Sequence, residues 1–277
     1  MYDSFITSVN NQKTTMEWMN LIIQNMSNMY TPGYKAVQGN FKSFLDGATI
    51  DDLNLKTEQG KSMPGTAPSN LFLEGKGYFI TKTPEGKTCY TRLGDFTFDG
   101  DGVYKTKDGA TVQGYILNDN GQAMASNTIQ KTDPNNPTHS SGGPAMMPTT
   151  DIKLWIDPSN GKYLGKYDEY EIKEDGVLYG KADKGKTLVP LYKVALANFN
   201  NSGRLTQIKD QCYVESKESG KPVLGSGLVR SGLLESGNAD FKDNVAYLQE
   251  AKMQLEVTNK LIQTNKQLLS EIVQLLG

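Results

Sequence analysis

Residues 248–276 read LQEAKMQLEVTNKLIQTNKQLLSEIVQLL, and this stretch places an apolar residue at every seventh position. The repeated residues are Leu248, Leu255, Ile262, Leu269 and Leu276. A neighbouring apolar stripe runs through Met253, Val257, Leu261, Leu268, Ile272 and Leu275. A seven-residue apolar repeat is typical of a helix that packs lengthwise against other helices. We therefore predict one helix over Asp240 to Leu276.

The predicted C-terminal helix is long for a chain of this size. At about 1.5 Å per residue it spans roughly 55 Å, so it needs a partner along its length. The heptad positions between the apolar residues hold Lys252, Asn259 and Lys266. A simple two-stranded zipper would bury these polar groups, so the pattern favours a larger or mixed helical bundle.

The N-terminus carries a second heptad pattern. Apolar or large residues recur in steps of four and three once Gln12 is included, at Phe5, Val9, Met16, Met19, Ile23, Met26 and Tyr30. Pro32 and Gly33 then end the helix, because proline cannot continue the helical bonding and glycine tolerates the left-handed conformation. The two terminal helices either close one monomer as a hairpin or form a layer shared between subunits, and periodicity alone does not choose.

The middle of the chain changes from a helical period to a period of two, which predicts strands. The strand-like runs begin at Tyr78, Thr88, Phe96, Thr111, Ile152, Tyr170, Val189 and Cys212. The turn pairs Glu85-Gly86, Asp108-Gly109, Asn120-Gly121 and Asp175-Gly176 supply the positive φ of tight hairpins. The predicted fold class is α+β, with paired, coiled-coil-like terminal helices and a central, mainly antiparallel β domain.

These patterns divide the chain into three parts. Residues 1–36 and 239–277 are expected to form a terminal helical domain, and residues 37–70 and 218–238 the connecting arms. Residues 71–217 are expected to form the central β domain, with a variable insertion at 118–189. Inside that insertion, residues 131–150 are rich in Pro, Gly and Ser, and we expect an exposed, mobile loop there.

Composition excludes several functions. The chain has 277 residues, with 29 Lys and Arg against 31 Asp and Glu, so its net charge is −2. That balance argues against a nucleic-acid partner. One His and two Cys leave little for metal, thiol or histidine chemistry. We therefore expect no enzyme, no metal and no other cofactor. We also expect no cleaved signal peptide and no membrane insertion, because no apolar run reaches about 18 residues.

Each candidate for chemistry has a simpler interpretation. Asp99-Gly-Asp-Gly102 lacks the later ligands of a calcium loop, so we interpret it as a solvated hairpin turn. His139 stands alone in the polar loop. The aromatic residues around Arg92 could imitate a single-strand nucleic-acid platform, but a β core with surface tyrosines fits better. Cys89 and Cys212 are far apart in sequence, which favours two buried free thiols, with a disulfide as the open alternative.

Several short sequence motifs resemble those of the axial proteins of the bacterial flagellum, the rod and hook family. The matching segments are Gln24-Asn-Met-Ser-Asn28, Thr31-Pro-Gly-Tyr-Lys35, Phe72-Leu-Glu-Gly-Lys-Gly-Tyr-Phe-Ile80, Tyr90-Thr-Arg-Leu-Gly-Asp-Phe96, Val112-Gln-Gly114, Ala195-Leu-Ala-Asn-Phe-Asn-Asn-Ser-Gly-Arg-Leu205 and Gly232-Leu-Leu-Glu-Ser-Gly-Asn-Ala-Asp240. They resemble the family's motifs in the family's order. The chain departs from the family's sequence motifs at Gln24, Met26, Ser27 and Gly237, and in the last helix at Lys252-Met-Gln-Leu255.

The resemblance implies a structural subunit of the basal-body rod, which polymerises helically through its terminal helices into a tubular drive shaft that transmits torque to the hook. The implied partners are further copies, other rod and hook proteins, the flagellar type III export apparatus and the ring proteins around the rod. The implied location is the periplasm-spanning basal body. Between the two kinds of rod subunit, the resemblance favours the distal one over the proximal one. A hook protein is the nearest alternative, and an adhesin-type β module oligomerised by its helices is a more distant one.

The resemblance and the heptads together predict an assembly interface. Its residues are Phe5, Val9, Met16, Met19, Ile23, Asn25, Met26, Asn28, Gly33, Tyr34, Asn238, Leu248, Leu255, Ile262, Leu269 and Leu276.

Overall fold

The computed structural model describes residues 2–42, 49–118, 120–123, 148–154, 169–182, 187–209 and 211–276. The chain forms two compact units. The helical unit contains Met1–Thr31, Lys35–Thr57 and Gly237–Gly277, and the β unit contains Pro32–Tyr34 and Glu58–Ser236. The polypeptide therefore crosses between the units several times, and residues distant in sequence share one unit.

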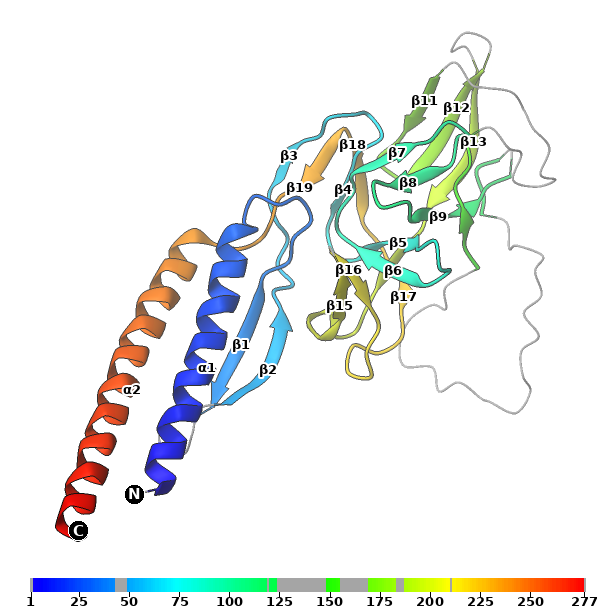
Figure 1. Ribbon diagram of the computed structural model, residues 1–277. Coiled ribbons are helices and arrows are strands. Elements are labelled where there is room, and N and C mark those ends of the chain that lie inside the picture. Colours follow the sequence, from blue (N-terminus) through cyan, green and yellow to red (C-terminus); the bar gives the residue numbers. More distant parts are fainter. Residues whose placement is uncertain are drawn as a thin grey trace, which may run out of the picture. The chain divides into compact units, whose positions relative to one another are not determined.

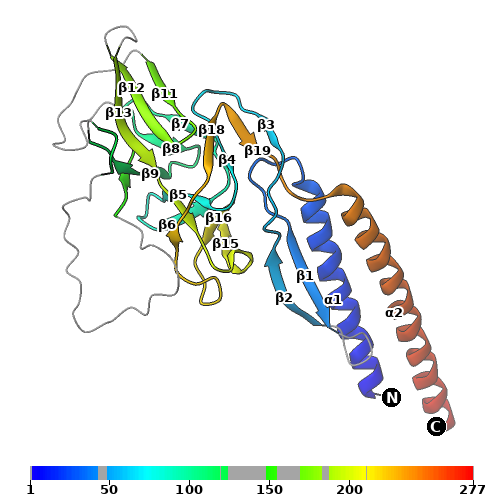
Figure 2. The same ribbon diagram turned by 180° about the vertical axis from the view of Figure 1, so that it is seen from behind.

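Two long helices build the helical unit. Helix α1 spans Tyr2–Ser27 and helix α2 spans Phe241–Leu276. They lie side by side with both chain ends at the same end of the pair, so they run antiparallel (Figure 1). The antiparallel hairpin of β1 (Val37–Lys42) and β2 (Thr49–Leu55) runs along α1 in both views (Figure 2). The predicted terminal helices are thus confirmed.

Helix α2 starts one residue later than predicted, because Asp240 is its N-cap. The Asp240 carboxylate accepts the N–H groups of Lys242 at 2.8 Å and Asp243 at 3.2 Å. Such a cap satisfies donors that have no partner within the helix. These backbone hydrogen bonds, led by that of Asp243, lower the pKa of Asp240.

The stripe that α1 buries differs from the predicted seam. The buried residues are Ser8, Asn11, Thr15, Trp18, Ile22 and Asn25. Trp18 and Ile22 form a small core with Ala251, against which Met19, Met26 and Leu248 pack. On α2 the fully buried positions are Asn244, Ala251 and Thr258. Much of this seam consists of small or polar side chains. The small ones let the two helices approach closely, and the polar ones form hydrogen bonds with nearby groups.

The described residues of the β unit form seventeen short strands and one 3-10 turn. The strands are β3 (Ser62–Pro64), β4 (Leu71–Glu74), β5 (Tyr78–Lys82), β6 (Thr88–Thr91), β7 (Phe96–Phe98), β8 (Tyr104–Thr106), β9 (Thr111–Ile116), β10 (Thr150–Asp151), β11 (Glu169–Ile172), β12 (Val177–Ala182), β13 (Thr187–Val194), β14 (Leu196–Asn198), β15 (Thr206–Lys209), β16 (Cys212–Val214), β17 (Val223–Leu224), β18 (Leu228–Ser231) and β19 (Leu233–Glu235), with the 3-10 turn at Ser202–Arg204. The main sheet runs β11-β12-β13-β9-β5-β6-β16-β15. The strand pairs are antiparallel, as predicted.

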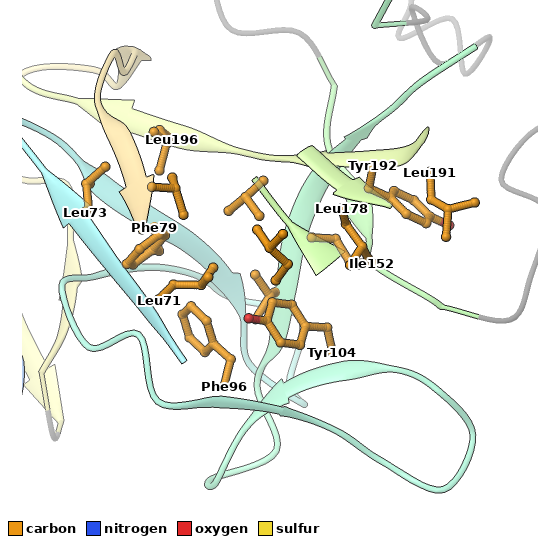
Figure 3. Packing of buried hydrophobic residues seen from close by; sticks show 14 of the residues in the cluster. Leu71, Leu73, Phe79, Phe96, Tyr104, Ile152, Leu178, Leu191, Tyr192 and Leu196 are labelled. Carbon is orange, nitrogen blue, oxygen red and sulfur yellow. The ribbon is translucent and has the colours of Figure 1, made fainter. Parts of the chain in front are cut away.

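The core of the β unit is a cluster of large side chains from strands far apart in sequence. Figure 3 draws fourteen of them as sticks and labels Leu71, Leu73, Phe79, Phe96, Tyr104, Ile152, Leu178, Leu191, Tyr192 and Leu196. The ring of Phe96 meets the rings of Phe79 and Tyr104 edge to face, with centroids 5.4 Å apart in both pairs. Edge-to-face packing adds to the free energy gained by burying the rings.

The predicted turns and strands largely coincide with the observed ones. Gly86, Gly109, Gly121 and Gly176 all have positive φ, between 75° and 83°. The run beginning at Ile152 differs: the strand there is β10, and Ile152 follows it. Ile152 bonds on two sides, since its N–H donates to Val112 and its carbonyl accepts from Tyr104.

The region expected as an insertion contributes to the main sheet. Its described residues form β10, β11 and β12 and the start of β13, and β13 pairs with β9. The expected mobile loop falls, except for residues 148–150, outside the described residues, and so does His139.

Two sequence interpretations are wrong. Cys89 and Cys212 form a disulfide, with their Cα atoms 5.5 Å apart, whereas free thiols were favoured. The tertiary fold brings them together because β6 pairs with β16, where Tyr90 lies opposite Tyr213. Nor are Tyr78 and Tyr90 surface tyrosines, since both are buried. Each packs its ring edge to face against Phe199.

Candidate assembly surface

Asn25 and Asn238 hold the β1–β2 hairpin in place within the helical unit. The Asn25 side chain donates to the carbonyl of Val37 at 2.8 Å and accepts its N–H at 3.0 Å. The Asn238 side chain accepts the N–H of Ala36 and donates to the carbonyl of Lys56, both at 2.7 Å. Each amide therefore satisfies two backbone groups at once. Both predicted interface residues therefore form hydrogen bonds with the backbone of their own chain.

Three more predicted residues lie where the chain leaves α1. Asn28 donates to the carbonyl of Gln24 and accepts the Thr31 hydroxyl. Gly33 has φ 72°, and an added Cβ would lie 2.6 Å from the backbone of Leu93. Only glycine fits there. Tyr34 is buried, and burial raises its pKa to about 12.

The apolar residues predicted on α1 divide into two groups. Phe5, Met19 and Met26 are half-buried. Val9, Met16 and Ile23 are exposed, at 40%, 53% and 48%, and so is Tyr30, at 79%, in the turn that follows α1. The predicted seam therefore straddles the edge of the contact with α2, and its outer half faces away from the subunit's own core.

Helix α2 divides in the same way. Leu248, Leu255 and Ile262 are half-buried on the side of α1, whereas Leu269 is exposed. Leu276 ends the helix, and its side chain lies outside the described residues. The neighbouring stripe is exposed throughout, at Met253, Val257, Leu261, Leu268, Ile272 and Leu275. Among the described residues, all but four of the exposed large apolar side chains belong to the helical unit.

The helix contact uses residues that the apolar pattern missed. Ser8, Asn11 and Thr15 are buried although they are polar, and the Gln12 side chain donates to that of Asn259 at 2.8 Å. Ser8 and Thr15 share their heptad position with Ile22, and Asn11 shares its position with Trp18, whereas Gln12 belongs to the predicted seam. The seven-residue spacing of these buried polar residues was the signal that the sequence offered. The apolar repeat on the adjacent stripe of the helix concealed it.

Helix α1 carries few charges for a helix with so much exposed surface. Its only charged side chains are Asp3, Lys13 and Glu17. Lys13 and Glu17 lie one turn apart, 3.9 Å from each other. The cores of protein interfaces are depleted of charged residues, so this composition is typical of a helix that becomes enclosed.

The helical unit also has a groove of about 550 Å³ between its helices and the hairpin. Trp18, Tyr247, Lys56 and Asp240 are among the residues that line it. Within the described ranges, no three His, Cys, Asp or Glu side chains gather in a way that could hold a metal ion. Neither of the described helices is long and apolar enough to cross a membrane.

Comparison with known proteins gives a family-model match within the β unit. Residues 72–179 match the family model described as the flagellar hook protein FlgE/F/G D1 domain. The chain is therefore similar to the rod and hook proteins among the flagellar axial proteins. It is similar to the flagellar basal-body rod protein FlgG of Bacillus subtilis, at 26% identity over 99% of both chains.

Two further relatives show that the chain is more similar to rod proteins than to a hook protein. It is 26% identical to the basal-body rod protein FlgG of Caulobacter vibrioides, over 92% of both chains. It is 21% identical to the hook protein FlgE of Rhizobium meliloti, over 99% of both chains. That hook alignment runs over 403 positions, far more than the 277 residues here, so it contains long gaps. The rod alignments are close to the chain's own length.

Proposed function

We propose that this chain is a structural subunit of the flagellar basal-body rod, most like FlgG, and that it acts as part of a tubular drive shaft. The observation that carries this is the similarity to FlgG rod proteins along almost the whole chain. The chain acts by assembly and carries out no catalysis. Its partners are further copies of itself and other axial proteins of the flagellum.

The distribution of apolar surface supports a polymer subunit. The exposed apolar side chains gather on the terminal helices, whereas the β unit encloses its own core. Contiguous exposed apolar surface marks interaction sites in proteins that are otherwise well packed. Burial between copies supplies the free energy for assembly, at about 25 cal/mol per Å² of apolar surface.

The predicted interface residues contribute to assembly in two ways. Val9, Met16, Ile23 and Leu269 supply apolar surface for contact with other copies. Asn25, Asn28, Gly33, Tyr34 and Asn238 hold the subunit's own backbone in the conformation that presents this surface. Substitutions in the first group weaken association without unfolding the subunit, whereas those in the second group first destabilise it.

The disulfide supports a location outside the cytoplasm. Disulfides persist in oxidising compartments such as the bacterial periplasm and are rare in the cytosol. We place the subunit in the periplasm-spanning part of the flagellum, and we propose that it leaves the cytoplasm reduced through the type III export apparatus. Cys89 and Cys212 then join after export. Contacts with the surrounding rings follow from this position.

The test is deletion of the gene in the source bacterium, followed by complementation and by electron microscopy of isolated basal bodies. A rod subunit gives non-motile cells whose basal bodies lack a complete rod, and the wild-type gene restores both. Complete rods that lack only the hook would favour the hook alternative, which the FlgE similarity supports. Unchanged flagella with lost surface adhesion would favour the adhesin alternative and contradict the proposal.

A further inference from the structure

The disulfide between Cys89 and Cys212 lies in the wall of a cavity. The cavity has a volume of about 380 Å³, and both cysteines belong to its lining. The described lining residues all lie within the β unit. Cavities of this size bind small molecules in other proteins. A small molecule that enters this cavity can therefore reach the bond between the two sulfurs.

The lining offers a small thiol both apolar contact and balanced charge. Pro84, Leu93 and Ile208 supply apolar surface. The described charged residues of the lining are three lysines and three carboxylates, namely Lys87, Lys107, Lys209, Glu85, Asp95 and Asp108. Because these charges are equal in number, the lining does not repel a thiolate by its net charge. A thiolate is the form of a thiol that attacks a disulfide.

The two sulfurs of the bridge differ in accessibility. Cys89 is 3% exposed and lies within β6, whereas Cys212 is half-buried and is the first residue of β16. β16 and β15 are the last two strands along the main sheet (Figure 1), so Cys212 lies near the edge of that sheet. The sulfur that is attacked depends on access. A thiolate in the cavity therefore reaches Cys212 more readily than Cys89.

We propose that this cavity is a site of thiol–disulfide exchange, at which Cys212 is the sulfur attacked and Cys89 the sulfur that leaves. The incoming thiolate forms a bond to Sγ of Cys212. The bond between the two cysteines breaks, its electron pair stays on Sγ of Cys89, and this thiolate takes a proton from water. The product is a mixed disulfide on Cys212. The exchange needs only the β unit, so it does not depend on the proposed rod function.

A dithiol completes the reduction, and the reverse reaction forms the bridge. The second thiolate of the dithiol attacks its own sulfur in the mixed disulfide, so the dithiol becomes a disulfide and Cys212 leaves as a thiolate. In reverse, Cys212 of the reduced chain attacks the disulfide of an oxidant, which releases one thiolate. Cys89 then attacks Sγ of Cys212 and releases the other. The bridge thus opens and closes through the same cavity.

The exchange changes how the last hairpin of the main sheet is attached. β16 pairs with β6 at a single position, Tyr213 opposite Tyr90. Tyr213 is fully buried and its ring meets that of Tyr78 edge to face, so this core contact remains when the bridge opens. Gln211 has φ 59°, the only positive value at a described residue other than glycine. That conformation is uncommon for residues with a side chain, and an open bridge lets the turn relax.

The first test traps the mixed disulfide on the full-length oxidised protein. Reduced glutathione is the probe, because its single thiol leaves the mixed disulfide as the first product. N-ethylmaleimide then caps the freed thiol, and peptide mass spectrometry locates both groups. We expect glutathione on Cys212 and maleimide on Cys89 in about tenfold excess over the reverse arrangement, because access selects the sulfur. Equal amounts, or an excess of the reverse arrangement, would overturn the assignment.

A second test asks whether the thiol enters through the cavity. Ile208→Trp places a large side chain in the lining, and Ile208 is 47% exposed, so the fold should be retained, which circular dichroism checks. Leu224→Trp is the matched control, because Leu224 is 40% exposed in the same unit and lies outside the lining. We expect glutathione to react about tenfold more slowly with Ile208→Trp and at the wild-type rate with the control. Equal rates in all three proteins would contradict entry through the cavity.

Unfolding the protein provides the last control. In guanidinium chloride both sulfurs are exposed, so the two arrangements should form in similar amounts. A wild-type bridge that reacts with glutathione only in guanidinium chloride would mean that the folded β unit shields both sulfurs, which would overturn the proposal. The deletion and complementation test decides the rod function separately.

Discussion

Arg92 and Glu235 form a buried ion pair, with 3.1 Å between Nη1 and Oε2 and side chains that are 4% and 1% exposed. The same guanidinium donates to the carbonyl oxygens of Leu73 at 2.9 Å and Gly75 at 2.5 Å. The other carboxylate oxygen of Glu235 accepts the N–H of Gly60 at 2.9 Å. The pair therefore joins the first part of the β unit's sequence, from Gly60 to Arg92, to its end at Glu235.

Breaking this pair from one side should destabilise the β unit. Glu235→Gln leaves the Arg92 charge buried without its counter-charge, so we expect a loss of about 3–5 kcal/mol in the free energy of unfolding. Denaturant unfolding measures it. The control is Glu74→Gln, which breaks the exposed pair with Arg230 and should cost less than about 1 kcal/mol. Equal losses in both variants would contradict this account.

Removing the Asn25 side chain should release the β1–β2 hairpin. Asn25→Ala leaves both backbone groups of Val37 without their partner, and each unsatisfied group costs about 1–3 kcal/mol when buried. Hydrogen exchange of the hairpin amides should accelerate while the β unit stays protected. Asn20→Ala, at an exposed position of the same helix, is the control and should leave the hairpin unchanged. Unaltered exchange in Asn25→Ala would show that other contacts hold the hairpin.

The β unit should lose stability in alkaline solution. Burial, and secondarily the carboxylate of Glu215, raises the pKa of Tyr90 to about 12. The folded state then holds its proton where the unfolded chain, with its ordinary value of about 10, releases it. This contribution is complete below about pH 10 and disappears as the pH rises toward 12. Unfolding measured at pH 8, 10 and 11 should show the decline, and Tyr90→Phe should make it shallower.

Reducing the disulfide should destabilise the β unit. The bridge closes a loop across 123 positions of sequence, and loss of a native disulfide typically costs about 2–5 kcal/mol. The melting temperature of the oxidised protein should therefore fall in dithiothreitol. The variant Cys89→Ala with Cys212→Ala should melt at the reduced protein's temperature and show no response to reductant. An oxidised sample that carries two alkylatable thiols would contradict the bridge.

Deleting Val257 to Gly277 should abolish assembly and leave the β unit folded. The deletion removes most of the exposed apolar stripe of α2, from Val257 to Leu275, whereas the β unit ends at Ser236. Complementation of a deletion strain tests assembly, and a thermal melt of the purified truncated chain tests folding. Restored motility would show that this part of α2 is dispensable. A melt without a cooperative transition would show that the β unit depends on the helices.

The sequence predicted the helices and most strands because their signals are local. Heptad spacing, the stop at Pro32 and Gly33, and the glycine turns such as Asp175-Gly176 depend on neighbours within a few residues. The helices and turns appear where they were expected, except that α1 ends at Ser27, before the predicted stop. The seam of the helix pair was misjudged, because Asn11 and Thr15 carry no apolar signal. Their burial depends on how closely α2 approaches.

By itself, the sequence determined the resemblance to rod and hook proteins, the α+β class and the exposed apolar stripes, since each depends on short local motifs or on regular spacing. Only the tertiary structure decided which stripe of α1 meets α2, that Cys89 meets Cys212, and that Arg92 pairs with Glu235 across 143 positions. Such contacts join residues that are remote along the chain. Their partners are selected by strand register and helix approach, which no single segment encodes.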